Sequence, residues 1–306
     1  MSDQNRTRVV RPSDEEWPAY LGELGAHPSP EELFVRGGPI RWGERAVAIV
    51  GTRRPSASGV QAARMIAGGL AEAGFAIVSG LAVGIDSVAH MAALDAGGYS
   101  LAVLGCGLDF PYPKANLGLK ERILEAGTMV SEYPDETSPQ PGYFPARNRI
   151  IAGLCAGTVV VEGGYKSGAL ITARIALDAN RSVFALPGSI RNPMAAAPNE
   201  LIRTSQASLV THFKHITDDL APGLVWATTA DDKPLAKPIA LDEREHAVLA
   251  LLEDTPLSVE FICKETDLNP GEVALALSRL EVRSLAIRRY GGYELSDAGA
   301  RAKAGR

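Results

Sequence analysis

The stretch that decides the fold reads AVAIVGTRRPSASGVQAARMIAGGLAEAGFAIVSG, residues 46–80. Two short apolar runs, 46–50 and 75–79, enclose a segment whose apolar residues recur with helical spacing. A strand, a helical crossover and a second strand form a βαβ unit, in which both strands run parallel in one sheet. We therefore predict that this segment begins a parallel α/β domain.

The same pattern continues along the chain. Further apolar runs end near Gly105, Tyr133, Glu162 and Gly188, and helical patterns separate them. Apolar runs of this kind are typical of parallel strands that are buried on both faces. The sequence therefore predicts a Rossmann-like parallel sheet with helices on both faces over residues 45–220.

Composition divides the rest of the chain. Residues 1–44 are polar with short apolar anchors, which predicts an N-terminal extension packed on the main domain. Residues 221–238 have the composition of a linker. Three helical patterns and a Gly291-Gly292 turn follow in residues 239–298, which predicts a small winged-helix domain. Residues 299–306 are a short tail.

Overall composition restricts the classes of function. The 306-residue chain has no apolar run long enough to span a bilayer. Its first twenty residues are too charged for a secretory signal, so we expect a cytoplasmic protein with no membrane segment. A formal net charge of −5 argues against coating of nucleic acid through overall positive charge. Any nucleic-acid binding must therefore use a local basic patch.

Two strand-end loops predict an anion pocket. Gly51, Thr52 and Arg53 follow the first strand of the domain and precede a helix, whose N-terminal amides and dipole favour an anion. The second strand ends in Ser79 and Gly80, where an NAD or FAD protein would need a ribose-binding acid. The G-x-G-x-x-G fingerprint is also absent, so neither dinucleotide is expected as a cofactor.

A third segment, PGYFPARNRIIAG, joins an aromatic residue to two arginines at a helix start. Phe144 with Arg147, Asn148 and Arg149 suits base stacking beside phosphate binding. On a helix, residues two apart point in different directions, so Arg147 and Arg149 are not expected to bind the same phosphate. One of them is a candidate for an internal ion pair.

A fourth segment, VEGGYKSGALITA, repeats the order of strand, glycine loop and helix start. It predicts a second anion cradle from Gly163, Gly164, Lys166, Ser167 and Gly168. A glycine loop by itself is more often an ordinary turn between a strand and a helix. Several such loops with arginines on one sheet edge favour a binding pocket instead.

Other polar residues are expected to have structural roles. Asp86 is expected to cap the helix that follows it, and His90 to pack inside the domain. His212 and His215 are spaced to share one face of a surface helix, and no third ligand is close in sequence, so no metal is expected. No catalytic triad order or acid-base carboxylate pair is evident, which favours a binding protein over an enzyme.

Taken together, the motifs GTRRPSASG, SGLAVGID, YPKAN, SEYP, FPARNRIIAGL, VVVEGG and SGALITA resemble the DprA family of DNA-processing proteins, also called Smf. The resemblance implies a cytoplasmic homodimer that binds single-stranded DNA, protects incoming DNA and helps to load RecA recombinase in natural transformation. The arginine of the family's GTR motif falls on Arg53, and its F-P-x-R-N-R motif falls on Phe144, Arg147 and Arg149. These four residues are the expected DNA contacts, and no catalysis is implied.

Two other functions are weighed against this one. The LOG family of nucleotide phosphoribohydrolases is similar in its sheet, but its catalytic glutamate would fall at Leu170 or Ile171, which are apolar here. A nucleotide-sensing module with the winged helix as its output is the second alternative. The winged helix itself balances Arg279 and Arg283 with acidic residues, so both duplex DNA and a protein remain candidate partners.

Overall fold

The computed structural model describes residues 6–222, 241–253, 255–283, 285–289, 291–296 and 303. The chain divides into two compact units at Trp226 and Ala227, and each unit is described by itself. Most of the predicted linker, residues 223–238, and the predicted tail apart from Lys303 lie outside the described residues. No described helix is both long and apolar enough to cross a membrane.

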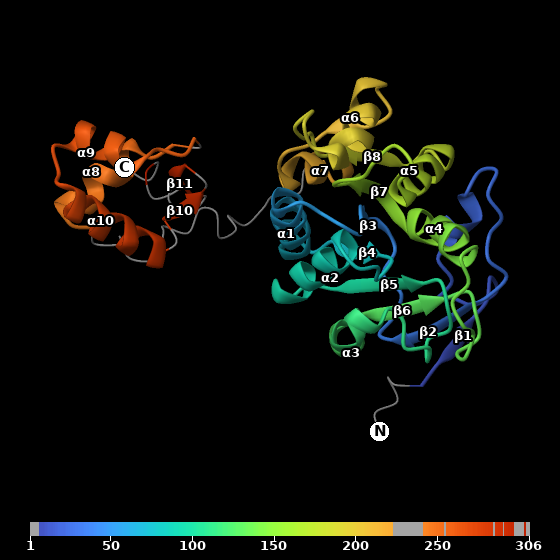
Figure 1. The fold of residues 1–306 in the computed structure, drawn as a ribbon. Coiled ribbons are helices and arrows are strands. Elements are labelled where there is room, and N and C mark those ends of the chain that lie inside the picture. The colour runs from blue at the N-terminus through green and yellow to red at the C-terminus, as the bar shows by residue number, and fades with distance from the viewer. Residues whose placement is uncertain are drawn as a thin grey trace. The chain divides into compact units, whose positions relative to one another are not determined.

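A nine-stranded sheet forms the centre of the first unit (Figure 1), in the order β1-β2-β6-β5-β4-β3-β7-β8-β9. The six predicted strands are all present and parallel to their neighbours of this set. They are β3 (Gly43–Val50), β4 (Ala76–Ser79), β5 (Ser100–Leu104), β6 (Thr128–Ser131), β7 (Cys155–Val160) and β8 (Ser182–Ala185). A short β9 (Ser208–Leu209) extends this part, and the predicted Rossmann-like class is confirmed.

The N-terminal segment does more than pack on the domain. Its strands β1 (Arg8–Val10) and β2 (Leu33–Gly37) are antiparallel to each other, and β2 is antiparallel to β6. Leu33 and Val35 alternate with half-buried residues and are fully buried, so β2 has the period of a strand with one face on the core. The complete sheet is therefore mixed, because the N-terminal extension adds two antiparallel strands to the edge of the predicted parallel set.

Helices cover both faces of the sheet (Figure 1). One face carries α1 (Ala57–Glu72), α2 (Ile85–Asp95), α3 (Leu117–Ala126) and α7 (Phe213–Leu220), whose apolar residues form cores with the strands beneath. The other face carries α4 (Tyr143–Gly153), α5 (Gly168–Asp178) and α6 (Ala196–Arg203). Apolar cores on both faces of the sheet thus pack against the strands whose ends carry the loops of the site.

The helix α1 shows how the local sequence produces one of these elements. Ser56 lies at its N-cap, and the Ser56 hydroxyl accepts a hydrogen bond from the Gly59 amide. Ile66 and Leu70, four residues apart, are fully buried against the sheet. Burial of each such side chain contributes about 1.5 to 3 kcal/mol. The cap and the apolar stripe together set where α1 begins and which face it buries.

The second unit has the predicted order of elements. The helices α8 (Glu243–Leu251), α9 (Val259–Thr266) and α10 (Pro270–Val282) precede an antiparallel hairpin of β10 (Ala286–Arg289) and β11 (Gly292–Leu295). They enclose a separate apolar core. Two basic residues at the end of α10 are engaged within the unit. Arg279, in its last turn, lies 3.0 Å from Asp242, and Arg283, at its C-cap, lies 3.0 Å from Glu245.

Candidate functional site

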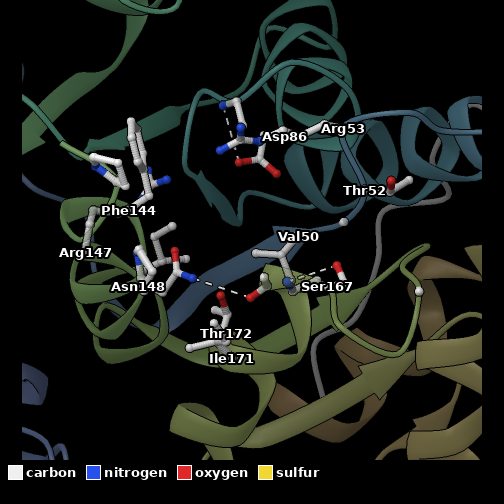
Figure 2. A pocket seen from close by; sticks show the side chains of 18 residues that line it. Val50, Thr52, Arg53, Asp86, Phe144, Arg147, Asn148, Ser167, Ile171 and Thr172 are labelled. Atoms are coloured by element: carbon white, nitrogen blue, oxygen red, sulfur yellow. Dashed lines mark hydrogen bonds between the residues drawn. The ribbon is translucent and has the colours of Figure 1, made fainter. Parts of the chain in front are cut away.

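A pocket of about 600 Å³ lies at the carboxyl edge of the sheet, where β3 and β4 end and where α4 and α5 begin (Figure 2). Ligands of open α/β sheets bind outside the carboxyl ends of the strands, because loops from several strands meet there. Nine of the predicted site residues line it, namely Gly51, Thr52, Arg53, Phe144, Arg147, Asn148, Gly164, Ser167 and Gly168. The structure thus brings three of the four predicted segments into one cavity, and the loop after β4 joins them through Ala82.

The loop after β3 is fastened on both sides. The Thr52 amide donates to the Glu162 carbonyl at 2.7 Å, and the Ile85 amide donates to the Thr52 carbonyl at 3.2 Å. Gly51 passes so close to Ile85 that a Cβ there would lie 2.5 Å from its side chain. Gly84 has a φ of +100° and faces the same loop. Arg53 is therefore presented by a backbone that its neighbours hold in place.

Arg53 is the exposed cation of the pocket. Its guanidinium carbon lies 5.8 Å from the centroid of the Phe144 ring. Among the described residues, no carboxylate pairs with Arg53, and its side chain has no hydrogen-bond partner. A guanidinium without a counter-ion beside an open aromatic ring suits a ligand that carries both negative charge and a planar group.

One face of α4 forms the wall opposite Arg53. Phe144, Arg147, Asn148 and Ile151 follow the i, i+3, i+4, i+7 spacing of a helix face, and all four line the pocket. Figure 2 shows the labelled side chains of Phe144, Arg147 and Asn148 on this wall. Phe144 also contacts Tyr112, with ring centroids 5.5 Å apart, so its ring is supported from behind.

Arg147 lines the pocket but is 5% exposed. Its Nη1 donates to the Gly80 carbonyl at 2.8 Å and also to the Val103 carbonyl. Burial lowers the pKa of Arg147 to about 10, and the nearby Asp86 opposes this shift. Arg147 therefore fastens α4 to the ends of β4 and β5. Direct phosphate binding needs an exposed charge, whereas the Arg147 guanidinium is buried and bonded to the backbone.

Arg149 leaves the same helix in another direction. It forms an ion pair with Glu132, and its Nε donates to the Pro28 carbonyl at 2.7 Å. The predicted divergence of Arg147 and Arg149 is confirmed, and Arg149 is the one that forms the internal ion pair. Arg149 does not line the pocket.

The remaining predicted residues lie just outside the main cavity. Ser79 is fully buried, and its hydroxyl donates to the Ile49 carbonyl at 2.6 Å. Gly80 lines an adjoining cavity of about 60 Å³ behind Phe144. Gly163 lies beneath its loop, where its amide donates to the Met194 carbonyl at 2.5 Å, and Lys166 is exposed beyond the lining.

Asp86 does not cap its helix, contrary to expectation. α2 begins at Ile85, with Gly84 at the N-cap and no side-chain cap. Asp86 lies inside the first turn, and its Oδ2 accepts from the amides of Gly80 at 3.1 Å and Ala82 at 3.4 Å. Burial raises the pKa of Asp86, and Arg147 opposes the rise. The Asp86 side chain thus holds the 80–82 loop, and it does not cap α2 because Asp86 lies two residues after the N-cap position.

His90 is fully buried, which confirms the predicted packing role. Its Nε2 accepts from the Leu81 amide at 3.3 Å, and its Nδ1 lies 2.7 Å from the Ser100 hydroxyl. Burial lowers the pKa of His90 to about 3, and the charge of Arg147 adds to the decrease. The imidazole is therefore neutral and holds the loop that follows β4.

The sequence predicted that His212 and His215 share one face of a helix, and this prediction is wrong. α7 begins at Phe213, so His212 lies at its N-cap, where its ring accepts from the Lys214 amide at 3.2 Å. The His215 ring accepts from the Thr211 amide at 3.4 Å. Among the described residues, no group of three potential ligands is placed to hold a metal ion.

Sequence reasoning missed three lining residues on α5, namely Ala169, Ile171 and Thr172. Ile171 and Thr172 lie three and four positions after Gly168, so helical spacing from the predicted helix start would have found these two. Asp86 is the carboxylate that lines the pocket within the described chain. The nearby Glu162 is buried and accepts from the Ser56 amide, the Ser56 hydroxyl and the Asn192 side chain.

Comparisons with known proteins find relatives of both parts of the chain. The family model described as DNA recombination-mediator protein A matches residues 8–221, and a DprA winged-helix model matches residues 232–292. Protein Smf of Escherichia coli is 39% identical over 297 residues, which cover 95% of this chain and 78% of that protein.

Two solved structures are similar to the first unit. The X-ray structure of DprA from Streptococcus pneumoniae has a TM-score of 0.66 and 40% identity, and the match covers 71% of this chain and 75% of that one. DprA from Helicobacter pylori, whose structure concerns its single-stranded DNA binding mode, has a TM-score of 0.62 and 28% identity over 72% of this chain and 98% of that one. The strand order, the two family matches and the extent of these similarities lead to one conclusion: this chain belongs to the DNA recombination-mediator protein A family, the DprA or Smf proteins.

Proposed function

We propose that the pocket binds single-stranded DNA. The observation that carries the proposal is the placement of Arg53, an exposed guanidinium with no counter-ion in the described chain, 5.8 Å from the Phe144 ring. Single-stranded nucleic acid offers phosphates and unstacked bases together, and proteins bind it with cations beside aromatic platforms. The Helicobacter pylori relative, whose structure concerns single-stranded DNA binding, supports this choice of ligand.

The roles divide between contact and positioning. Arg53 and the N-terminal amides of α5 bind phosphate, while Phe144 stacks on a base. The backbone can approach the DNA at small residues of two loops, namely Gly51, Thr52, Ser167 and Gly168. Asn148 of α4 also lines the pocket. Arg147 and Asp86 keep α4 and the 80–82 loop in place behind these contacts.

The finer parts of the function rest on family resemblance. We propose that the protein acts as a homodimer that protects incoming DNA and helps to load RecA recombinase. Sedimentation of the full chain tests the dimer. Formation of RecA filaments on single-stranded DNA, with and without this protein, tests loading, and an unchanged filament rate would contradict it.

The binding proposal is tested by fluorescence anisotropy with labelled oligo-dT. Arg53→Ala is expected to weaken binding for all sequences alike, because a phosphate contact carries no base information. The logarithm of affinity should fall with the logarithm of salt by about 0.7 per phosphate that the protein neutralises. Arg64→Ala, which removes an exposed arginine of α1 outside the pocket lining, is the matched control and should bind as wild type does.

The same titration separates the alternatives. A nucleotide-sensing pocket would bind mononucleotides tightly and ignore oligo-dT, and a phosphoribohydrolase would release free base from AMP. The phosphoribohydrolase alternative is disfavoured by the sequence, because the motif of the LOG family would place its catalytic glutamate at Leu170 or Ile171, which are apolar. Binding of oligo-dT that does not respond to salt or to Arg53→Ala would refute the proposed contacts.

A further inference from the structure

Three strands whose carboxyl ends lie along the sheet edge that holds the pocket are consecutive in the sheet. β3, β7 and β8 are neighbours, although β7 and β8 follow β3 by more than a hundred residues. Neighbouring strands lie about 4.8 Å apart, so the loops at their carboxyl ends follow one another along the edge. The order along this edge is the Arg53 loop, the Gly163–Ser167 loop and the Pro187–Asn192 loop.

Each of these loops places a basic side chain next to an apolar one. Arg53 lies beside Phe144, which α4 brings to it. Tyr165 is 71% exposed and is followed in sequence by the exposed Lys166. Ile190 is 96% exposed and is followed by the exposed Arg191. Within the described chain, no carboxylate pairs with Arg53, Lys166 or Arg191.

Hydrogen bonds connect the Gly163–Ser167 loop with the end of the Pro187–Asn192 loop and the residues that follow it. The Ala197 amide donates to the Gly163 carbonyl at 2.8 Å, and the Gly163 amide donates to Met194. Asn192 also donates to the Glu162 carboxylate at 2.8 Å. These hydrogen bonds join the residues at the start of the Tyr165 loop to residues at the end of the Ile190 loop and just after it, so the two loops are neighbours along the sheet edge.

A single exposed apolar residue is common on protein surfaces and needs no explanation. Here the two exposed apolar residues, Tyr165 and Ile190, fall on the loops of neighbouring strands. Each is followed in sequence by a cation that pairs with no carboxylate among the described residues. We call Tyr165, Lys166, Ile190 and Arg191 the row. The row begins at the pocket, because the residues that flank Tyr165 and Lys166 line the pocket, namely Gly164, Ser167 and Gly168. Alternating base-stacking and phosphate-binding groups are what an extended single strand of nucleic acid requires.

We infer that the DNA site continues beyond the pocket, and that the strand crosses the sheet edge from β3 over β7 to β8. In this path Tyr165 is a second stacking platform and Ile190 a further apolar base contact. Lys166 and Arg191 bind the phosphates between them. The inference rests on the proposed function, because it extends the same site along the polymer.

The test uses the full chain and a series of oligo-dT lengths. Wild-type affinity should keep rising after the length at which Arg53→Ala first weakens binding. Tyr165→Ala should leave the shortest bound oligonucleotides unaffected and weaken the longer ones by about fivefold to roughly 140-fold, the range for loss of one base stack. Met65→Ala, which shortens an exposed apolar residue of α1, is the control and should bind every length as wild type does.

Two further measurements report on the path directly. Tyr165→Trp should give an exposed indole whose fluorescence is quenched by long oligo-dT, whereas the matched Met65→Trp should show no quenching. Lys166→Ala and Arg191→Ala should each reduce the slope of log affinity against log salt by about 0.7 for long oligonucleotides.

The outcomes separate this inference from the function on which it rests. If wild type does not bind oligo-dT, or Arg53→Ala binds normally, the proposed function fails. If Arg53 is required but Tyr165→Ala matches wild type at every length, the path over β7 and β8 is wrong. A change in the association state of Tyr165→Ala or Ile190→Ala, with DNA binding intact, would assign the row to a protein interface and overturn the inference.

Discussion

The guanidinium of Arg147 fills the space that a side chain on Gly80 would occupy. A Cβ on Gly80 would lie 2.4 Å from Nη1 of Arg147, and that same nitrogen donates to the Gly80 carbonyl at 2.8 Å. The end of β4 and the start of α4 therefore interlock. Because Phe144 is three residues before Arg147 on one helix face, this contact also sets the position of the stacking ring.

Gly80→Ala is expected to push Arg147 out of its site. Overpacking at a tight contact costs about 1 to 3 kcal/mol, and displacement of α4 should also weaken oligo-dT binding. Urea unfolding and anisotropy measure the two effects. Gly118→Ala is the control, since a Cβ there meets no atom within 4 Å and alanine favours the helix α3. Wild-type stability and binding of Gly80→Ala would contradict the interlock.

Phe144→Ala is expected to lose on the order of 1 to 3 kcal/mol of binding free energy, because a base stack is removed. Phe144→Tyr retains an aromatic face and should keep most of the affinity. The comparison by oligo-dT titration separates stacking from general disturbance, since both variants change the residue beside Arg53. Equal losses in the two variants would argue against a stacking role.

Arg149→Ala is expected to lower stability with a small effect on DNA contact. Its partner Glu132 would lose its counter-ion, and the Pro28 carbonyl would lose a donor. The free energy of unfolding should fall by about 1 to 3 kcal/mol, as for other part-buried charged hydrogen bonds. The salt slope of oligo-dT binding should stay at the wild-type value, in contrast to Arg53→Ala. A reduced slope in Arg149→Ala would show that this residue reaches phosphate.

His90 makes stability depend on pH. Its pKa falls from 6.5 to about 3 on folding, so between these values the unfolded chain binds more protons than the folded one. The contribution of His90 to the free energy of unfolding is complete above pH 6.5. It is lost as the pH falls towards 3, by about 1.4 kcal/mol per pH unit at most. Urea unfolding at several pH values should show a shallower dependence in His90→Gln than in wild type. The same slope in both proteins would refute this assignment.

Asp86 acts in the opposite sense. Burial raises its pKa above 3.8, so between the unfolded and folded values the folded chain binds more protons. Its contribution to the free energy of unfolding is therefore favourable at low pH and declines as the pH rises through the pKa of Asp86 in the folded protein. His90 and Asp86 offset each other in acid, which is why the His90→Gln comparison is made against wild type at each pH.

The local sequence determined most of the fold. Alternation of apolar runs with helical patterns from residue 46 onward predicted six parallel strands and their helices, because period and strand-end glycines are properties of short segments. It did not predict that residues 8–10 and 33–37 pair antiparallel with the sheet edge. That pairing depends on β2 meeting β6, almost a hundred residues later in the chain.

The site shows the same division. Motif and spacing identified the pocket loops and the divergence of Arg147 from Arg149, since both follow from helix geometry. Only the tertiary structure decided which arginine remains free. The Gly80 and Val103 carbonyls come from two other strands and engage Arg147, Glu132 engages Arg149, and no carboxylate of the described chain reaches Arg53. A charge is available for DNA only where the fold supplies no partner, and partners distant in sequence are set by the packing of the sheet.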